Sequence, residues 1–558
     1  MRVRVAEGEL EGRLIDGVRC FNGVPYAAPP VGELRFRAPR PAPPWQGVRP
    51  AVENAPPSSQ LDRSNAKRVL ELAADRDPGL EGVASIPPAF AADVRLDGSS
   101  EDCLYLDVYV PETDGEEPLP VYVYYHGGAN RFNSAAGAHD YQRGERLARA
   151  EKIIVVQPQY RLGALGWVHF GLVDPEMEEA VNLGLQDQIA ALRWVSENAA
   201  AFGGDPRNVT IGGESAGATA VSHLIANPQT RRYARRAILQ SLTPFGNWCT
   251  LLEPEARAIV GVYQAILGAG NVASADADEL LSMQDLLLRL FHPDAILPWR
   301  VHGPVVDGDL VAEQPVLQLA ERGLDDPGFE VMIGFAKDEW QFFRGHTPTL
   351  QGTDPQTAVG LLSQVFGPDG AQLVYDGFAV AHPDHPPEHL LSDVLSFVHF
   401  KLSSLQIART LARQGNDVYV FQYSYDHPGF DGYLRALHTG TLPFVWRAGE
   451  AQRPAFRSME GADPDEVRRL TTEFGALYAQ YIRDGKPGDP WERFDPEAEP
   501  VLWFGLPLET RRRLVRAELD AFAAAGVTGI RQLEERMLGD LRRRLPDALA
   551  WLTAQSDT

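Results

Sequence analysis

The chain has 558 residues, of which 44% are hydrophobic and 23% charged, a composition that can bury a large core and excludes a mainly disordered or fibrous protein. Its 52 basic and 76 acidic side chains give a net charge of −24, which makes nucleic acid and membrane surfaces poor partners. At about 150 residues per domain, the length alone predicts three to four domains.

The three cysteines, Cys20, Cys103 and Cys249, are too few and odd in number for a disulfide framework, which indicates a reducing compartment. The N-terminal residues lack the apolar core of a signal peptide, and no run of about 18 apolar residues occurs. We therefore expect a cytoplasmic protein that does not span a membrane.

Six short apolar runs predict strands buried on both faces, the pattern of a sheet covered by helices. They span residues 119–125, 153–160, 208–212, 237–240, 330–335 and 418–425. Between the second and third runs, residues 182–201 carry apolar side chains at helical spacing. A strand, a helix and a strand in one compact stretch predict a βαβ unit, and therefore an α/β fold with a mostly parallel central sheet.

Two stretches differ from this pattern. Residues 60–98 are rich in Ala, Arg, Asp and Pro without a strand pattern, which predicts a mobile cover loop. After residue 505 the chain becomes rich in Arg and Leu, and the runs 532–538 and 541–552 predict amphipathic helices. We interpret residues 506–558 as a helical extension on the surface, with an oligomer contact as the alternative.

The sharpest local signal is Gly-Glu-Ser-Ala-Gly at residues 213–217, which follows a predicted strand and precedes a helical stretch at 218–226. A sharp turn from strand to helix needs small residues on both sides of a serine that projects from the sheet. The helix that follows points its positive end at a developing oxyanion. We therefore predict that Ser215 is a nucleophile, whereas an ordinary turn is the alternative.

An acyl-transfer serine also needs oxyanion donors. His-Gly-Gly-Ala at residues 126–129 directly follows the predicted strand 119–125, and its glycines let backbone N–H groups face a small anion. Ala216 supplies a further N–H group from the turn after Ser215. A glycine-rich strand end without this role is the alternative, but its place before the serine in chain order favours the functional interpretation.

A catalytic acid and a base are expected after the serine. Asp338 and Glu339 closely follow the predicted strand 330–335 and are the two candidates for the acid. Only His427 and His438 follow soon after the last predicted strand, so they are the two candidates for the base. The residue pattern alone leaves both choices open.

The sequence resembles the type-B carboxylesterases, the cholinesterase-like branch of the α/β-hydrolases, over about residues 5–505. Residues 202–217, Phe-Gly-Gly-Asp-Pro-Arg-Asn-Val-Thr-Ile-Gly-Gly-Glu-Ser-Ala-Gly, match the nucleophile signature of that family throughout. Residues 101–108, Glu-Asp-Cys-Leu-Tyr-Leu-Asp-Val, match its second signature. Further matches lie at residues 21–27, 34–36, 160–163, 304–308 and 485–487.

The resemblance implies an α/β-hydrolase fold with large insertions around the active site. It also implies one catalytic domain at residues 1–505, similar to bacterial para-nitrobenzyl esterases. It implies Ser215 as nucleophile, Glu339 as acid and His438 as base. By the same resemblance, Gly128, Ala129 and Ala216 would supply the oxyanion donors. Ion pairs of Arg35 with Glu101 and of Arg161 with Asp187 are also implied.

The chain departs from the family pattern at three places. Cys103 occupies the position of a family disulfide cysteine, but the preceding loop has no cysteine to pair with it. Ala129-Asn130 stands where the family often has Gly-Phe, so we expect a differently shaped oxyanion loop. Trp340 replaces the usual glycine after the acid. No residue matches the aromatic side chain that binds choline, so a cholinesterase activity is not implied.

These observations predict a carboxylic ester hydrolase that forms an acyl-enzyme and needs no metal or organic cofactor. An amidase or carbamate hydrolase with the same triad is the alternative, and a non-catalytic binding homologue is disfavoured because every triad position is filled. We expect a small-molecule ester with an apolar or aromatic part. Its pocket is predicted around Trp299, Arg300, His302, Phe397 and His399.

Overall fold

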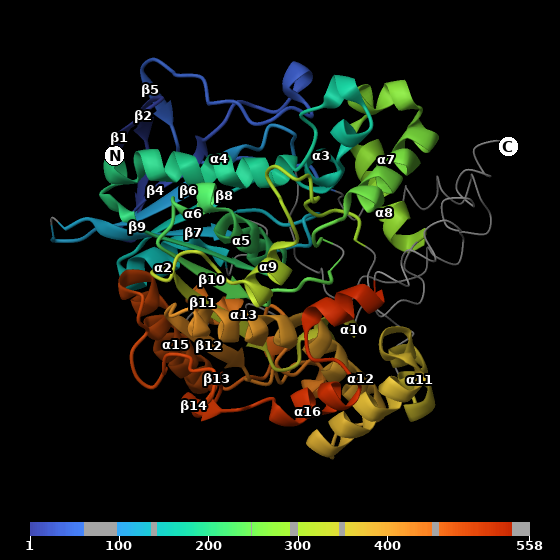
Figure 1. Cartoon of the computed structure of the whole chain (residues 1–558). Coiled ribbons are helices and arrows are strands. Elements are labelled where there is room, and N and C mark those ends of the chain that lie inside the picture. The colour runs from blue at the N-terminus through green and yellow to red at the C-terminus, as the bar shows by residue number, and fades with distance from the viewer. Residues whose placement is uncertain are drawn as a thin grey trace.

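A large twisted sheet with helices on both faces organises the chain (Figure 1). The computed structural model describes residues 1–60, 98–115, 117–135, 142–246, 248–290, 300–344, 352–448 and 457–537. The predicted cover loop therefore lies almost entirely outside the described residues, as does the predicted helix at 541–552. Residues 530–537 are helical, in agreement with the start of the other predicted C-terminal helix.

The main sheet has 11 strands within the described ranges. Their order is β14 (Glu509–Arg512), β13 (Pro500–Phe504), β12 (Val418–Tyr423), β11 (Glu330–Ala336), β10 (Arg236–Gln240), β9 (Gly204–Glu214), β7 (Leu119–Tyr125), β8 (Ile154–Pro158), β6 (Tyr105–Pro111), β4 (Val18–Pro25) and β3 (Arg13–Ile15). Neighbours from β8 to β13 are parallel, and the pairs at both margins are antiparallel. A small sheet of β1 (Arg2–Val5), β2 (Gly8–Glu11) and β5 (Val48–Pro50) lies near the N-terminus. The predicted α/β fold is confirmed.

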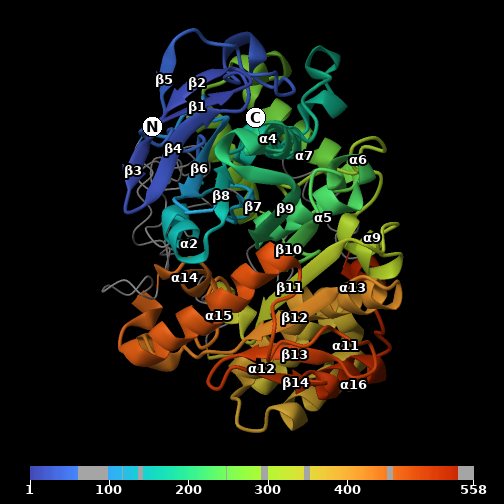
Figure 2. The ribbon, with the colours of Figure 1, turned by 90° about the vertical axis from the view of Figure 1, so that its left-hand side faces the viewer.

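Alternation along β7 shows why helices cover both faces, because successive side chains of a strand point to opposite sides. Val121, Val123 and Tyr125 belong to one core cluster, whereas Tyr122 and Tyr124 belong to another. The first cluster includes residues of α4 (Leu183–Asn198), α5 (Ala216–Ala226) and α13 (Leu402–Arg413). The second includes residues of α2 (Gly144–Glu151), α14 (Leu442–Val445) and α15 (Pro464–Asp484). Figure 2 shows α2 and α15 on one side of the strands and α5 and α13 on the other.

The remaining helices form two groups beside this layered core. The helices α3 (Gly163–Trp167), α7 (Glu253–Leu267) and α8 (Ala277–Leu290) contribute to a separate apolar cluster, at the upper right of Figure 1. The other group lies to the right of the lower strands in the same view and consists of α10 (Glu339–Arg344), α11 (Pro355–Ala381), α12 (Pro387–Ser396) and α16 (Arg516–Ala524). The short helices α6 (Pro228–Arg231) and α9 (Pro315–Glu321) complete the labelled α-helices, and the unlabelled helical residues 530–537 follow α16.

The chain beyond residue 505 continues the fold before it leaves the described part. Strand β14 pairs with β13 in the main sheet, and α16 packs against α11. The division of the chain into a catalytic domain that ends at 505 and an extension stays a prediction. Within the described ranges, no helix combines the length and apolarity needed to cross a bilayer.

The order of strands brings functional segments together. Strand β9 lies next to β7 although β8 precedes it in the chain, so the order changes direction at β7. In parallel sheets of this kind, ligands bind outside the carboxyl ends of the strands near such a point. The segments that follow β7, β9, β11 and β12 carry the residues predicted for catalysis.

Candidate active site

The predicted nucleophile sits in a strained turn between β9 and α5. Ser215 has φ 58° and ψ −124°, a conformation that costs energy for any residue but glycine. A Cβ atom on Gly217 would collide with the carbonyl oxygen of Tyr125, and one on Gly213 would collide with the backbone of Gly217. The Ser215 N–H donates to the Gln240 carbonyl at 2.9 Å, which ties the turn to β10. The glycines thus permit the close packing that holds the serine in place.

The segment after β7 forms a second tight turn beside the serine. Positive φ angles occur at three successive residues, 108° at Gly128, 55° at Ala129 and 57° at Asn130. A Cβ atom on Gly127 would lie only 3.2 Å from Ser215 Cβ, so this loop runs directly beside the nucleophile. Ala129 also shares a small buried cluster with Ala216 of α5. The predicted oxyanion donors therefore belong to two segments that lie next to each other.

Asn130 anchors this loop from the side. Its Nδ2 atom donates to the carbonyl oxygens of Trp248, at 3.3 Å, and His302, at 3.1 Å. The backbone carbonyl of Asn130 accepts a hydrogen bond from the Gly163 N–H at 2.7 Å. Asparagine tolerates the left-handed backbone better than most residues, so it meets both the conformational and the hydrogen-bonding needs of this position. This gives a physical reason for the departure from Gly-Phe.

Glu339 and His438 form a short contact. Glu339 begins α10, directly after β11, and its Oε2 atom lies 2.6 Å from His438 Nδ1. The other carboxylate oxygen accepts from Ala336 N at 2.7 Å, so the carboxylate is held at both ends. Asp338 instead accepts from Ala436 N at 3.3 Å. The geometry favours Glu339 over Asp338 as the acid.

His427 has a different environment from His438. Its Nε2 atom lies 2.6 Å from the Tyr423 hydroxyl and its Nδ1 atom 2.7 Å from Ser458 Oγ. Burial lowers the pKa of His427 to about 3, with Asp426 opposing the shift. A ring bonded to two hydroxyl groups and kept neutral by burial is suited to a structural role, so the geometry favours His438 as the base.

Glu214 is the one acidic residue of the site that the sequence interpretation gave no role. Its Oε1 atom lies 3.2 Å from His438 Nε2, so the imidazole has a carboxylate at each nitrogen. Burial raises the pKa of Glu214 to about 7, an effect that His438 opposes and Glu339 supports. Burial lowers the pKa of His438, but the carboxylates of Glu214 and Glu339 outweigh it and raise the pKa above its usual value. The only sequence signal was its place next to the serine.

Aromatic rings surround the imidazole. The rings of Phe342, Phe343 and Phe400 have centroids 5.7, 5.1 and 5.1 Å from that of His438. Trp248 stacks on Phe343 at 6.4 Å and packs with Ala129 and Ala216. We call Trp248, Phe342, Phe343 and Phe400 the aromatic wall. It joins the base to the predicted oxyanion segments through an apolar surface.

Trp340 lies next to this wall. Its ring centroid is 5.0 Å from that of Phe343 and 4.3 Å from that of His399, and its backbone N–H donates to Ser396 Oγ at 2.9 Å. Trp340 is buried and therefore supports the wall from within the protein. This is the structural consequence of a tryptophan where the family usually has glycine.

The remaining residues predicted for the pocket occupy different places. His399 packs against Trp340 and Phe400 next to the aromatic wall. His302 is buried, and its backbone carbonyl accepts the hydrogen bond from Asn130. Phe397 packs against Phe378 and Phe522 in the helical layer. Arg300 pairs with Glu534 at 3.0 Å. Trp299 lies outside the described residues.

Two ion pairs implied by the family resemblance are confirmed. Arg35 Nε lies 2.7 Å from Glu101 Oε2. The guanidinium of Arg161 binds both oxygens of Asp187, at 2.7 and 2.8 Å, and both side chains are buried. The three cysteines are buried and free, so Cys103 has no disulfide partner. Among the described residues, the group that could hold a metal ion lies outside the predicted triad and consists of His382, His385 and Asp393.

Comparison with known proteins identifies the family of the chain. The model of the carboxylesterase family matches residues 1–522. Para-nitrobenzyl esterase of Bacillus subtilis is 30% identical over 518 residues, which cover 91% of this chain and 93% of that protein. Phenmedipham hydrolase of Pseudarthrobacter oxydans is 30% identical over 504 residues, 89% of this chain and 94% of that protein.

A solved structure shows the same fold over nearly the whole length. The carboxylesterase of Geobacillus stearothermophilus superposes with a TM-score of 0.77 at 28% identity, and the match covers 93% of this chain and 99% of that one. The solved structure of a PNB esterase gives a TM-score of 0.74 at 26% identity with the same coverage. The chain therefore belongs to the carboxylesterase family and is a serine carboxylesterase with the α/β-hydrolase fold.

Proposed function

We propose that the enzyme hydrolyses carboxylic esters through an acyl-enzyme on Ser215, with His438 as the general base and Glu339 as its partner. The observation that carries the proposal is the 2.6 Å contact between Glu339 and His438, beside the strained turn that holds Ser215. A carboxylate on Nδ1 fixes the tautomer of the ring and stabilises the imidazolium that forms.

The proposed reaction has two halves. His438 Nε2 takes the Ser215 proton as the serine oxygen attacks the ester carbonyl, and the imidazolium then protonates the leaving alcohol. Water repeats the sequence on the acyl-enzyme and releases the acid. Backbone N–H groups of Gly128, Ala129 and Ala216 would bind the oxyanion, and losing one such donor typically costs about 10²–10³ in rate.

The aromatic wall supports a substrate with an apolar or aromatic part. Its rings border both His438 and the segments that carry the predicted donors, so an aryl or alkyl group of a bound ester would meet an apolar surface. The substitution Phe343→Ala should raise KM relative to the unaltered enzyme. We expect this increase to be larger for phenyl esters than for acetate esters of short alcohols.

The nucleophile is tested by a burst experiment with a p-nitrophenyl ester, followed by mass spectrometry of the trapped acyl-enzyme. We expect one acyl group per chain on the peptide that contains Ser215. Ser215→Ala should abolish both the burst and the label. Ser241→Ala is a matched control, because Ser241 is also buried, follows β10 and has a positive φ of 53°. Full activity in Ser215→Ala would refute the proposal.

A second candidate is hydrolysis of amides or carbamates by the same residues. The relative named phenmedipham hydrolase supports keeping this candidate and makes phenmedipham a direct test substrate. Matched ester, anilide and carbamate substrates with the same aryl group separate the possibilities. A kcat/KM for the carbamate that exceeds that for the ester would favour the second candidate.

We also propose a reducing compartment such as the bacterial cytoplasm. The support is that Cys20, Cys103 and Cys249 are all buried thiols without disulfide partners. Counting free thiols in denatured enzyme purified from the native cell under alkylating conditions tests this, with three expected.

A further inference from the structure

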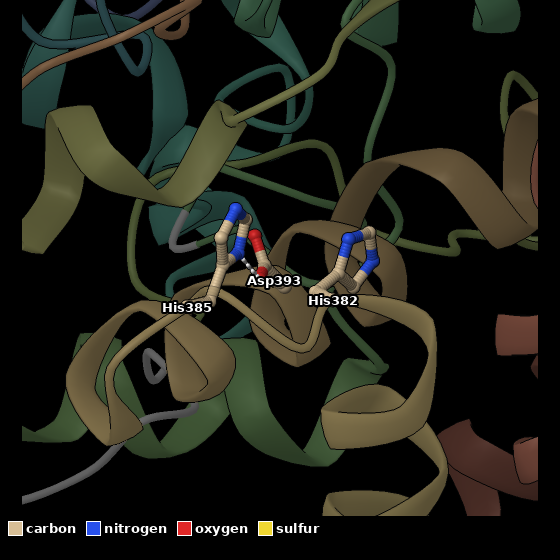
Figure 3. A group of neighbouring side chains, drawn as sticks. All are labelled: His382, His385 and Asp393. Atoms are coloured by element: carbon tan, nitrogen blue, oxygen red, sulfur yellow. Dashed lines mark hydrogen bonds and ion pairs between the residues drawn. The ribbon is translucent and has the colours of Figure 1, made fainter.

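A cluster of two histidines and an aspartate lies between α11 and α12, apart from the predicted triad. His382 and His385 occupy the loop that joins these helices, and Asp393 lies on α12 (Figure 3). One ligand atom from each side chain falls within 4.8 Å of the others. Two imidazoles and a carboxylate are a donor set that zinc and other first-row divalent metals accept.

The loop backbone presents the two histidines together. The His382 N–H donates to the Phe378 carbonyl at 2.8 Å, and the His385 N–H donates to the His382 carbonyl at 3.1 Å. Pro386 and Pro387 follow at once and restrict the backbone at the start of α12. The two rings consequently lie nearly parallel, at 12°, with centroids 5.1 Å apart.

The hydrogen bonds of His385 define its tautomer. Its Nε2 atom lies 2.8 Å from Arg435 Nη1, and its Nδ1 atom lies 2.6 Å from Asp393 Oδ2. A guanidinium only donates, so Nε2 must accept and Nδ1 carries the proton that Asp393 receives. The Nδ1–Asp393 contact is therefore the place where a metal ion would replace a proton.

His382 has its own carboxylate partner. Its Nε2 atom lies 3.1 Å from Glu518 Oε1 on α16, and its side chain is 29% exposed. A carboxylate on one ring nitrogen orients a metal-ligating histidine and makes the other nitrogen a better donor. The exposure of His382 gives solvent ions access to the cluster.

We propose that His382, His385 and Asp393 form a binding site for a divalent transition metal of the zinc class. When the metal binds His385 Nδ1, the ring proton moves to Nε2 and the Nδ1 lone pair goes to the metal. An Nε2–H group then faces the N–H group of Arg435, so the metal and the Arg435–His385 hydrogen bond exclude each other. Glu518 remains the partner of His382.

Zinc titration of the full chain tests the site. Protein without an affinity tag is stripped with EDTA, dialysed and titrated with ZnCl₂ in a calorimeter, at about one pH unit above the ordinary imidazole pKa. Co²⁺ in parallel reports coordination by its visible absorption. We expect one ion per chain. The cysteines should not compete, because burial raises the pKa of each to about 12.

Variants distinguish a site from weak surface binding. His385→Ala and Asp393→Asn should weaken zinc binding about 100-fold, and Glu518→Gln about tenfold. His382→Gln changes a partly exposed side chain and keeps the test valid if a buried variant fails to fold. His389→Ala is the control, since its ring centroid is 6.0 Å from that of His385 and it lies outside the cluster. It should bind zinc like the unaltered enzyme.

Arg435→Gln provides the sharpest test. A glutamine can accept from Nε2–H through its amide oxygen, so this variant should bind zinc about tenfold more tightly. The proposal is overturned if the unaltered enzyme binds no stoichiometric zinc. It is also overturned if the cluster variants bind as tightly as His389→Ala. In those cases Asp393, His385 and Arg435 form a structural hydrogen-bond chain only.

Discussion

Glu214 Oε1 lies 3.2 Å from His438 Nε2, on the nitrogen that the proposed mechanism uses to accept the Ser215 proton. The ring thus lies between two buried carboxylates, since Glu339 holds the other nitrogen at 2.6 Å. Both carboxylates favour the charged imidazolium, which is the form produced when the serine attacks. Glu214 is therefore placed to influence the protonation of the base.

Glu214→Gln should move the acidic limb of the pH profile of kcat/KM to lower pH. The neutral imidazole is the active base, so activity is lost as the pH falls through the pKa of His438. Glu214 is one of the groups that raise this pKa, and removing its charge lowers the pKa. The measurement is kcat/KM for a p-nitrophenyl ester across the acidic range.

Glu197→Gln is the matched control for this shift. It removes the same charge from an exposed position on α4, so its profile should coincide with that of the unaltered enzyme. An unchanged acidic limb in Glu214→Gln would mean that Glu214 does not raise the pKa of His438.

His438→Ala should affect catalysis, whereas His427→Ala should affect the stability of the fold. Loss of the proposed base should lower kcat by about 10⁴-fold or more, whereas His427→Ala should keep kcat in the folded protein. His427→Ala removes bonds to the Tyr423 and Ser458 hydroxyls, so its cost should appear as about 1–3 kcal/mol of stability. Steady-state kinetics and thermal unfolding of both variants check this, and the reverse pattern would exchange their roles.

The six strands from β12 to β8 in the sheet order could be predicted closely from the sequence, because each contains an apolar run buried on both faces, whereas the buried strands β6 and β13 were not predicted. β7 and β11 match their predicted runs almost residue for residue. Strand β14 at the margin of the sheet could not be predicted in this way, because its residues Glu-Thr-Arg-Arg are at most half-buried and give no apolar signal. For the same reason, the residue pattern after residue 505 predicts helices but not β14.

In the candidate site, too, some residues could be predicted from a local sequence pattern and others could not. The serine turn and the glycine loop carry local signals, because their geometry requires small residues at fixed positions. The choices of Glu339 and His438 needed the family resemblance, since each has a plausible neighbour in the sequence. An isolated bridge between Asp338 and Leu437 brings the two segments together, and a contact so distant in the chain leaves no local pattern.

Asn130→Ala should lower kcat about 10- to 100-fold for the same ester, because the loop loses its bonds to Trp248 and His302. KM should change much less if the loop acts on the oxyanion. Asn130→Gly separates two causes, since glycine relieves the cost of φ 57° but cannot form the bonds. If glycine restored full activity, backbone conformation rather than anchoring would explain the defect.

Asp187→Asn should destabilise the fold by about 3–5 kcal/mol, because it leaves the buried Arg161 guanidinium without its charge partner. The pair joins the segment after β8 to α4, and both side chains are almost fully inaccessible to solvent. Glu253→Gln is the control, since its pair with Arg257 is half-exposed and should contribute less than about 1 kcal/mol. Urea unfolding monitored by tryptophan fluorescence gives both values. Equal effects of the two substitutions would show that burial does not set the strength of the Arg161–Asp187 pair.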